Sequence, residues 1–337
     1  MIFLKILLYP FSIIYFFISE LKNLLYNQNI FKTTKFKIPV IGIGNLNTGG
    51  SGKTPMAEYI FEHFSENFKL ALLSRGYKRS TKGFLLADNN STPELIGDEP
   101  FQVFQKFKKI NVAVDEDRVR GVKNLLKIIP ELNGIILDDS FQHRKISPKL
   151  NILLTSYKKP FFRDKLLPIG TLRESSKGYR RADLVIVTKC PINMEANEMN
   201  LLKKQIDFNP AKNVFFTTIS YSKTLFGVKN IELNCFKKEK ILLVTGVANP
   251  NPLLDYLNSQ NINFFHLNFS DHHKYSKNDI FKIHKDFKSK TILTTEKDYV
   301  KIKKLNLDNN LYFIKMRTLF LNDGDKSFKK IIYNRLN

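Results

Sequence analysis

The feature that most constrains the fold of this chain is a glycine-rich turn directly after an apolar run that resembles a buried strand. Residues 38–55 read IPVIGIGNLNTGGSGKTP. Glycines in such a turn let backbone N–H groups converge on phosphate oxygens, and the following helix adds its positive N-terminal end. Lys53 would reach the β- and γ-phosphates, and Thr54 would ligate Mg²⁺. The residues expected to bind the nucleotide are Thr48, Gly49, Gly50, Ser51, Gly52, Lys53, Thr54 and Pro55.

The match to the phosphate-loop pattern has one departure, because Asn47 stands where the strict pattern has glycine. After glycine, Asn is the residue that best tolerates a positive φ, so Asn47 is compatible with such a turn. Pro55 fits a first helical turn, and Tyr59, Ile60 and Phe64 continue an apolar helical face. The alternative is a turn that only links a strand to a helix.

Composition predicts a folded protein with one large or two medium domains, since the chain has 337 residues of which 43% are hydrophobic. The net charge of +23 favours anionic partners such as nucleic acid, phosphorylated substrates or an acidic membrane. A biased amino-acid usage, rich in Lys and without Trp, is the alternative explanation for the excess of Lys. Cys190 and Cys235 have no metal-ligand spacing, which favours a reducing cytosolic setting without disulfides or zinc.

The N-terminal segment predicts an apolar helix. Residues 6–18 are almost wholly apolar, and thirteen residues are fewer than the roughly 20 that span a bilayer, so only a strained span from Met1 is conceivable. A helix lying in the membrane interface fits better, with Lys32, Lys35 and Lys37 against anionic headgroups. The apolar residues that recur at helical spacing are Leu7, Phe11, Ile14, Ile18, Leu21 and Leu25, opposite Lys5, Ser12 and Ser19.

Two other interpretations of this segment remain open. A secretory signal lacks support, because no Ala precedes Ala57 to form the usual cleavage site. The helix could also pack on the protein itself and hide its aromatic residues there.

Alternating strand and helix patterns predict an α/β fold, with a P-loop NTPase-like parallel sheet and a second, smaller α/β domain. The boundaries we expect are an N-terminal membrane-associated helix at 1–30, a phosphate-loop core at 31–210, a linker at 211–239 and a C-terminal domain at 240–337. After the first strand, the strands are expected at 70–73, 111–114, 134–137, 152–154 and 183–187, and a second set begins at Lys240 in KILLVTGVANP and continues at 262–267, 291–295 and 310–314.

Two pairs of carboxylates are expected at the ligand edge of the sheet, one pair at the end of a strand and the other in a turn. The run GIILDDSFQHR ends an apolar strand with Asp138 and Asp139, either of which suits the Mg²⁺-binding role at the end of a strand, with a helix N-cap as the alternative. The turn GDEP carries Asp98, which could accept the proton of an attacking hydroxyl, and Glu99, which could assist at the metal. A turn-capping role is the alternative for both residues.

Basic and histidine-containing loops provide the remaining candidates. Arg173, beside Glu174 in the run GTLRESSKGYRR, is suited to bidentate phosphate contact, although a solvated loop is the alternative. Arg75 follows a strand at the expected ligand edge. In SDHHKY, His272 or His273 could orient a carboxylate base or contact phosphate.

Eight motifs, taken in order, resemble those of the tetraacyldisaccharide 4′-kinases of lipid A biosynthesis, and the resemblance extends to about Val300. It implies transfer of the ATP γ-phosphate to the 4′-hydroxyl of an acylated glucosamine disaccharide 1-phosphate. It further implies two α/β domains with the site between them, on a peripheral or monotopic protein at the cytoplasmic face of the inner membrane. The motifs are GNLNTGGSGKTP, LSRGYKR, GDEP, LDDSFQHR, GTLRES, VTGVANP, DHHKY and TEKDYVK.

The resemblance also implies roles by position. Asp98 would be the base, tuned by His272, while Asp138 and Asp139 would serve the metal and the phosphates and Glu99 would lie beside the metal. The choice of His272 over His273 rests on the preceding Asp271. The remaining residues expected in the cleft are Arg75, Gln142, His143, Arg173 and Glu174.

Two other classes of protein compete with this kinase. A P-loop ATPase or GTPase acting as a switch or assembly factor would need a water-positioning residue and no acceptor base. A nucleic-acid-dependent enzyme would need a basic and aromatic interleaved module, which the sequence lacks. We therefore expect ATP and Mg²⁺ as cofactors, a lipid acceptor and an anionic membrane as partners, and neither nucleic acid nor an obligate protein partner.

Overall fold

The computed structural model describes residues 2–206, 213–271, 273–286, 291–305 and 310–337. They form two compact units, one made of Met1–Thr218 with Thr318–Asn337 and the other of Ile219–Arg317. The chain leaves the first unit within strand β8 (Asn213–Phe226) and returns within β13 (Leu311–Phe320). Each unit is described by itself.

The first unit is built on a sheet with the strand order β3-β4-β2-β5-β1-β6-β7-β8. All neighbours in this order are parallel except β3 and β4, so the strands share one carboxyl edge. Central strand β1 pairs Val40 with Ile135 of β5 and Ile41 with Leu150 of β6. The strands are β1 (Val40–Asn45), β2 (Leu70–Ser74), β3 (Leu85–Leu86), β4 (Asn111–Val114), β5 (Gly134–Leu137), β6 (Leu150–Ser156) and β7 (Leu184–Thr188).

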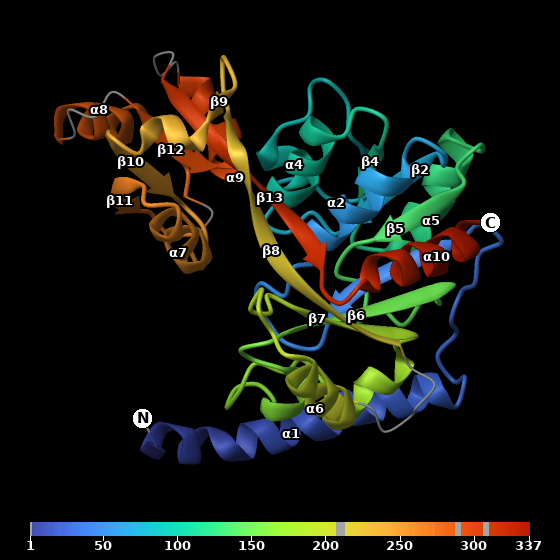
Figure 1. Cartoon of the computed structure of the whole chain (residues 1–337). Helices are drawn as coiled ribbons and strands as arrows, with labels where there is room; N and C mark the ends of the chain where they lie inside the picture. Colours follow the sequence, from blue (N-terminus) through green and yellow to red (C-terminus); the bar gives the residue numbers. More distant parts are fainter. Residues whose placement is uncertain (1, 207–212, 272, 287–290, 306–309) are drawn as a thin grey trace. The chain divides into compact units, whose positions relative to one another are not determined.

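Helices cover both faces of this sheet (Figure 1). Along β1, Ile41 and Ile43 enter the core beneath α2 and α10, whereas Val40 enters the core beneath α5, as the two-residue period of a strand requires. Gly44 has no room for a side chain, because a Cβ there would lie 2.7 Å from the backbone nitrogen of Phe141. The helices are α1 (Ile2–Asn27), α2 (Lys53–Phe64), α3 (Pro93–Ile96), α4 (Asp98–Lys106), α5 (Arg118–Ile128), α6 (Ala196–Ile206) and α10 (Gly324–Leu336), with short 3₁₀ turns η1 (Phe161–Arg163) and η2 (Ser176–Arg181).

The second unit has its own sheet in the order β11-β10-β12-β13-β8, with β9 on β8. Strands β11, β10, β12 and β13 are parallel, and their apolar side chains form two cores, one of which holds Leu253 and Leu257 of α7. The elements are β9 (Ile231–Glu232), η3 (Leu233–Phe236), β10 (Lys240–Thr245), α7 (Asn251–Ser259), β11 (Asn263–Asn268), α8 (Lys277–Asp286), β12 (Ile292–Thr295), α9 (Glu296–Ile302) and η4 (Lys303–Leu305).

The expected α/β class and every expected strand are confirmed, whereas the domain boundaries are not those of the structure. Within the expected linker 211–239, residues 213–226 form the long strand β8. Residues 318–337 return to the first unit, because Phe328 and Ile332 of α10 are buried in the same core as Ile41 and Phe61. The boundary at 240 therefore separates neighbouring parts of one compact unit.

Helix α1 packs on the first unit through its polar stripe. The Tyr15 hydroxyl donates to the carbonyl of Arg173 (2.8 Å), and Asn23 Nδ2 donates to Glu174 (3.3 Å). Ser12 is buried, while the opposite stripe is exposed and apolar, including Phe11 and Ile18. None of the helices in the described ranges is long and apolar enough to cross a membrane.

Candidate active site

The phosphate loop joins β1 to α2 at the carboxyl edge of the sheet. Gly49 and Gly52 have φ angles of 112° and 88°, which side chains rarely adopt, and Gly52 forms the N-cap of α2. Pro55 lies in the first turn of this helix, as expected. Asn47 does not have the positive φ that its place in the pattern suggested. Its Nδ2 instead donates to Asp164 (2.7 Å), so it anchors the loop through its side chain.

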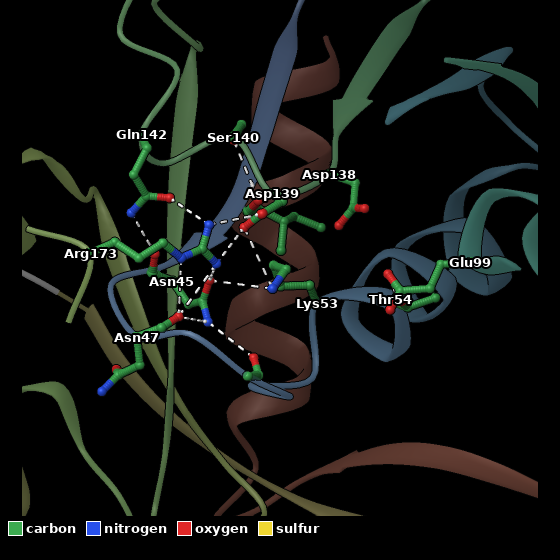
Figure 2. A network of polar contacts seen from close by, with 12 residues as sticks. Asn45, Asn47, Lys53, Thr54, Glu99, Asp138, Asp139, Ser140, Gln142 and Arg173 are labelled. Atoms are coloured by element: carbon green, nitrogen blue, oxygen red, sulfur yellow. Dashed lines mark hydrogen bonds and ion pairs between the residues drawn. The ribbon is translucent and has the colours of Figure 1, made fainter. Parts of the chain in front are cut away.

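Lys53 and the carboxylates after β5 lie together, as the sequence predicts (Figure 2). Lys53 Nζ is 3.5 Å from Asp139 Oδ1 and donates to Asn45 Oδ1 (3.3 Å). Arg173 holds the same carboxylate through two parallel bonds of 2.9 and 3.0 Å, and it also donates to Asn45 Oδ1 (2.8 Å). Two cations, one carboxylate and one amide thus converge beside the phosphate loop.

The two neighbouring carboxylates have opposite pKa shifts. Burial raises the pKa of Asp138 to about 6, with the charges of Glu99 and Asp139 adding to the effect. Burial acts in the same direction on Asp139, but the charges of Lys53 and Arg173 outweigh it and lower the pKa of that carboxyl. Asp139 is therefore firmly anionic, whereas Asp138 gives up its proton closer to neutrality.

Glu99 connects the start of α4 to the phosphate loop. The Thr54 hydroxyl donates to Glu99 Oε2 (3.0 Å), and the charge of Glu99 reaches Asp138. Asp98, which is half-buried, is the first residue of the same helix. The turn before it packs on the loop after β2, since a Cβ on Gly97 would lie 3.2 Å from the backbone of Gly76. This packing brings the GDEP turn to the same sheet edge as Thr54.

A chain of hydrogen-bonded polar side chains holds Arg173 in position. Gln142 accepts from Arg173 Nη1 (3.2 Å) and donates to the carbonyl of Asn45 (2.8 Å). Glu174, which is buried, accepts from Gln142 Nε2 (3.1 Å) and from Arg181 (2.7 Å). Glu174 was expected as a cleft residue. In the structure its carboxylate makes contacts within the protein, and these orient Gln142.

His143 and Arg75 lie at the same edge. Burial lowers the pKa of His143 to about 4, and the charges of Arg118 and Arg75 add to this, while Asp139 opposes it. The His143 imidazole is therefore neutral at physiological pH. Arg75 is exposed and close enough to act electrostatically on both His143 and Arg118.

Of the two histidines in SDHHKY, His272 lies outside the described residues. His273 is described within the second unit, where its ring stacks on Phe269 at 4.6 Å between centroids. The His273 ring also contacts Tyr275 edge-on, and its Nε2 lies 3.2 Å from Asp279. His273 is thus built into the packing of its own loop.

The sequence interpretation missed three residues at the strand ends, Asn45, Thr188 and Lys189. Asn45, the last residue of β1, bonds Lys53, Arg173 and the loop. Ser74, the last residue of β2 and part of the LSRGYKR motif, donates to Asp138 Oδ2 (3.1 Å). Thr188 and Lys189, at the end of β7, donate to loop carbonyls. A polar residue at the end of an apolar strand was the available signal, but which strands neighbour the loop depends on the sheet order.

The donor set suits a divalent cation. Asp138 Oδ1 and Ser51 Oγ are buried and have no hydrogen-bond partner among the described residues, which is unusual for buried oxygens. Glu99, whose charge reaches Asp138, and Thr54, whose hydroxyl donates to Glu99, offer further oxygens, and Mg²⁺ prefers such oxygen ligands. No group of three or more His, Cys, Asp or Glu suited to a metal occurs in the described part of the chain, so nucleotide phosphates would have to complete the coordination.

A glycine-rich loop, a lysine at the start of its helix and two strand-end carboxylates on a parallel sheet define a P-loop nucleotide-binding protein. The sequence profile of the tetraacyldisaccharide-1-P 4'-kinase family matches residues 4–337. The chain therefore belongs to this family.

Relatives with this description align along nearly their whole length. The tetraacyldisaccharide 4'-kinase of Flavobacterium johnsoniae is 42% identical over 320 residues, covering 95% of this chain and 94% of that protein. The corresponding protein of Flavobacterium psychrophilum is 43% identical over 334 residues, covering 98% and 96%. The crystal structure of LpxK from Aquifex aeolicus in complex with ATP has a TM-score of 0.79 and 29% identity, with 99% and 100% coverage.

Proposed function

We propose that this protein transfers the γ-phosphate of ATP to the 4′-hydroxyl of an acylated glucosamine disaccharide 1-phosphate in lipid A biosynthesis. The observation that carries the proposal is the convergence of Lys53, Arg173 and Asp139 beside the phosphate loop, in a chain that matches the kinase family end to end. Phosphoryl transfer needs charge neutralisation and alignment more than covalent participation by the protein, and this cluster supplies both.

The cations act on the nucleotide. The loop amides and Lys53 bind the phosphates, and Lys53 exchanges its contact with Asp139 for the β- and γ-phosphate oxygens. Arg173 stays aligned because Asp139, Asn45 and Gln142 hold its guanidinium in one plane. Its fixed position costs no reorganisation when charge develops on the transferred group.

Thr54, Asp138 and Glu99 are the residues that would hold Mg²⁺. Bound there, Mg²⁺ would neutralise charge on the β- and γ-phosphates. The Ser51 hydroxyl, which has no hydrogen-bond partner in the part of the chain that the structure describes, is assigned to donate to a phosphate oxygen.

Asp98 is assigned to the acceptor. Its carboxylate would orient the 4′-hydroxyl and take the proton as the new bond between oxygen and phosphorus forms and the bond to the β–γ bridging oxygen breaks. The family resemblance assigns His272 as its partner, in the segment that begins with Asp271. The neighbouring His273 is engaged by Phe269, Tyr275 and Asp279 within its own loop.

Helix α1 is assigned to the membrane surface, at the cytoplasmic face of the inner membrane. An ordinary surface helix buries its apolar stripe, but α1 buries Ser12 and Tyr26 and leaves the apolar stripe exposed. The stripe then enters the interface while Lys32, Lys35 and Lys37, all exposed, meet anionic headgroups. This arrangement brings a lipid acceptor to a peripheral or monotopic enzyme.

ATP turnover in detergent micelles, with and without the acylated disaccharide 1-phosphate, tests the proposal. We expect turnover to depend on the lipid, the lipid to gain one phosphate, and Lys53→Ala to abolish both. ATP consumption that is equal without lipid would instead indicate the P-loop ATPase alternative.

A further inference from the structure

The outward carbonyls of the phosphate loop are held by side chains from neighbouring strand ends. Asn45 Nδ2 donates to the carbonyl of Asn47 (2.7 Å) and more weakly to that of Gly49 (3.4 Å). Lys189 Nζ donates to the carbonyl of Gly50 (2.6 Å), and the Thr188 hydroxyl donates to that of Ser51 (2.8 Å). Two consecutive carbonyls of the loop are therefore bonded by two consecutive residues, Thr188 at the end of β7 and Lys189 directly after it.

These two bonds fix the orientation of two peptide groups of the loop. In a planar trans peptide the N–H points opposite to the C=O. Holding the carbonyl of Ser51 therefore turns the amide of Gly52 to the other side. The peptide whose carbonyl Lys189 holds is fixed at both ends, because its N–H, the amide of Ser51, donates to the carbonyl of Gly49 (3.0 Å). Glycine-rich loops have many accessible conformations, so a loop without such bonds would lose entropy when phosphate orders it.

The backbone conformation and the contacts of Lys189 indicate that this residue serves to hold the phosphate loop. Lys189 has φ 59°, a backbone conformation that costs energy for a residue with a side chain. Burial lowers the pKa of its ammonium group, yet among the described contacts its hydrogen bond goes to a backbone carbonyl instead of a carboxylate. Thr188 is buried, and a Cβ on Gly52 would lie 3.7 Å from its methyl group, so loop and strand end are in close contact.

We propose that Thr188 and Lys189 are positioning residues that pre-organise the phosphate loop for a nucleotide triphosphate. The inference deepens the proposed function and rests on it for the identity of the nucleotide. The charge of Lys189 also lies on the outer side of the loop and adds to the positive potential at the phosphates. Loss of either donor should weaken the binding of phosphates more than the binding of the nucleoside.

Nucleotide binding without lipid tests the inference. Isothermal titration with ATP and ADP in the presence of Mg²⁺, and displacement by adenosine, should be compared for the full chain and its variants. We expect Lys189→Met to raise the Kd of ATP and ADP about tenfold, and Thr188→Val about fivefold, with adenosine affinity unchanged. Lys158→Met, which removes an exposed lysine from the neighbouring loop after β6, is the matched control and should bind ATP like the wild type.

Conservative variants separate positioning from general loss of structure. Lys189→Arg and Thr188→Ser keep a donor at each carbonyl and should bind ATP within about threefold of the wild type, even if Lys189→Met lowers the Tm. In the lipid-dependent assay, Lys189→Met should raise the KM for ATP about tenfold and change kcat less than threefold.

Equal affinity for ATP in the wild type, Lys189→Met and Thr188→Val would overturn the inference while leaving the kinase intact. An equal loss of affinity for ATP and adenosine would also overturn it, since the effect would then not concern the phosphates. A wild-type protein that binds ATP but never phosphorylates the lipid would overturn the proposed function alone.

Discussion

At the residue scale, neighbouring carboxyl groups of the site differ in pKa because their surroundings differ. Asp138 and Asp139 are adjacent in sequence, but Asp138 is buried near another carboxylate and Asp139 lies between Lys53 and Arg173. One carboxyl therefore has a raised pKa and the other a lowered pKa, and the two can perform different tasks. Asp98 is assigned a third task, which mutation can isolate.

Asp98→Ala should lower lipid-dependent turnover by about 10²-fold or more with little change in ATP affinity, because the acceptor loses its base while the phosphate loop stays intact. Single-turnover kinetics and isothermal titration with ATP measure the two quantities. Lys53→Ala is the contrasting variant and should lose ATP affinity. If Asp98→Ala also lost ATP binding, Asp98 would belong to the metal site and not to the acceptor.

His143 should make the protein less stable in acid. In the unfolded chain the imidazole protonates near its ordinary pKa of 6.5, whereas in the folded protein burial keeps it neutral down to about 4. The unfolded state therefore binds more protons in this window, and the stability contributed by neutral His143 is lost as the pH falls from about 6.5 to about 4.

His143→Gln removes this titration, so its Tm should fall less than that of the wild type between about pH 7 and pH 5. Calorimetry of the protein without nucleotide or metal, at half-unit pH steps, measures the difference. Parallel Tm curves for the two proteins would show that the ring is accessible to protons in the folded state.

At the element scale, the phosphate-loop helix α2 depends on a helix from the other end of the chain. Tyr59 of α2 contacts Phe320 and Phe328 through ring centroids 5.0 and 5.8 Å apart, and its hydroxyl donates to Asp325. Phe328 is fully buried in the core that also holds Phe61. The C-terminal helix α10 thus supports the element that begins with Lys53.

Phe328→Ala should lower the free energy of unfolding by about 3 to 5 kcal/mol, because it leaves a cavity that the surrounding rings cannot fill. Urea denaturation followed by far-UV circular dichroism measures the loss. Lys330→Ala, at an exposed position of the same helix, is the control and should stay within about 0.5 kcal/mol of the wild type. Equal midpoints for the two variants would mean that α10 contributes little to the core.

At the scale of the whole molecule, the sequence predicts the elements better than their assembly. The expected strands have a local apolar pattern, and the phosphate loop has a local glycine pattern, so both were predictable. Strand β8 was missed, because its residues 213–226 mix polar and aromatic side chains and were assigned to the linker. The return of residues 318–337 to the first unit was not, because an apolar helical face does not specify which core buries it. For the same reason the roles of Thr188 and Lys189 became visible only with the sheet order, which places β7 beside β6 and β6 beside β1.

Attachment of the whole molecule to a membrane should depend on the exposed stripe of α1. Phe11, Ile14 and Ile18 are 57 to 64% exposed, and burying three such side chains in a lipid interface is favourable by several kcal/mol. The triple variant Phe11→Asp, Ile14→Asp and Ile18→Asp should therefore bind vesicles of phosphatidylglycerol and phosphatidylethanolamine at least about 100-fold more weakly, as measured by flotation.

A matched control tests whether this effect belongs to α1 or to any new surface charge. Leu201 is 60% exposed on α6, and Leu201→Asp should float with vesicles like the wild type. Because the stripe faces away from the protein, the triple variant should keep its ATP affinity and lose turnover only with lipid presented in a bilayer.

High salt should weaken the binding of the wild type to vesicles only in part, since lysines contribute but the apolar stripe is not screened. A triple variant that floats fully, or a wild type released entirely by salt, would assign membrane attachment to the basic surface instead.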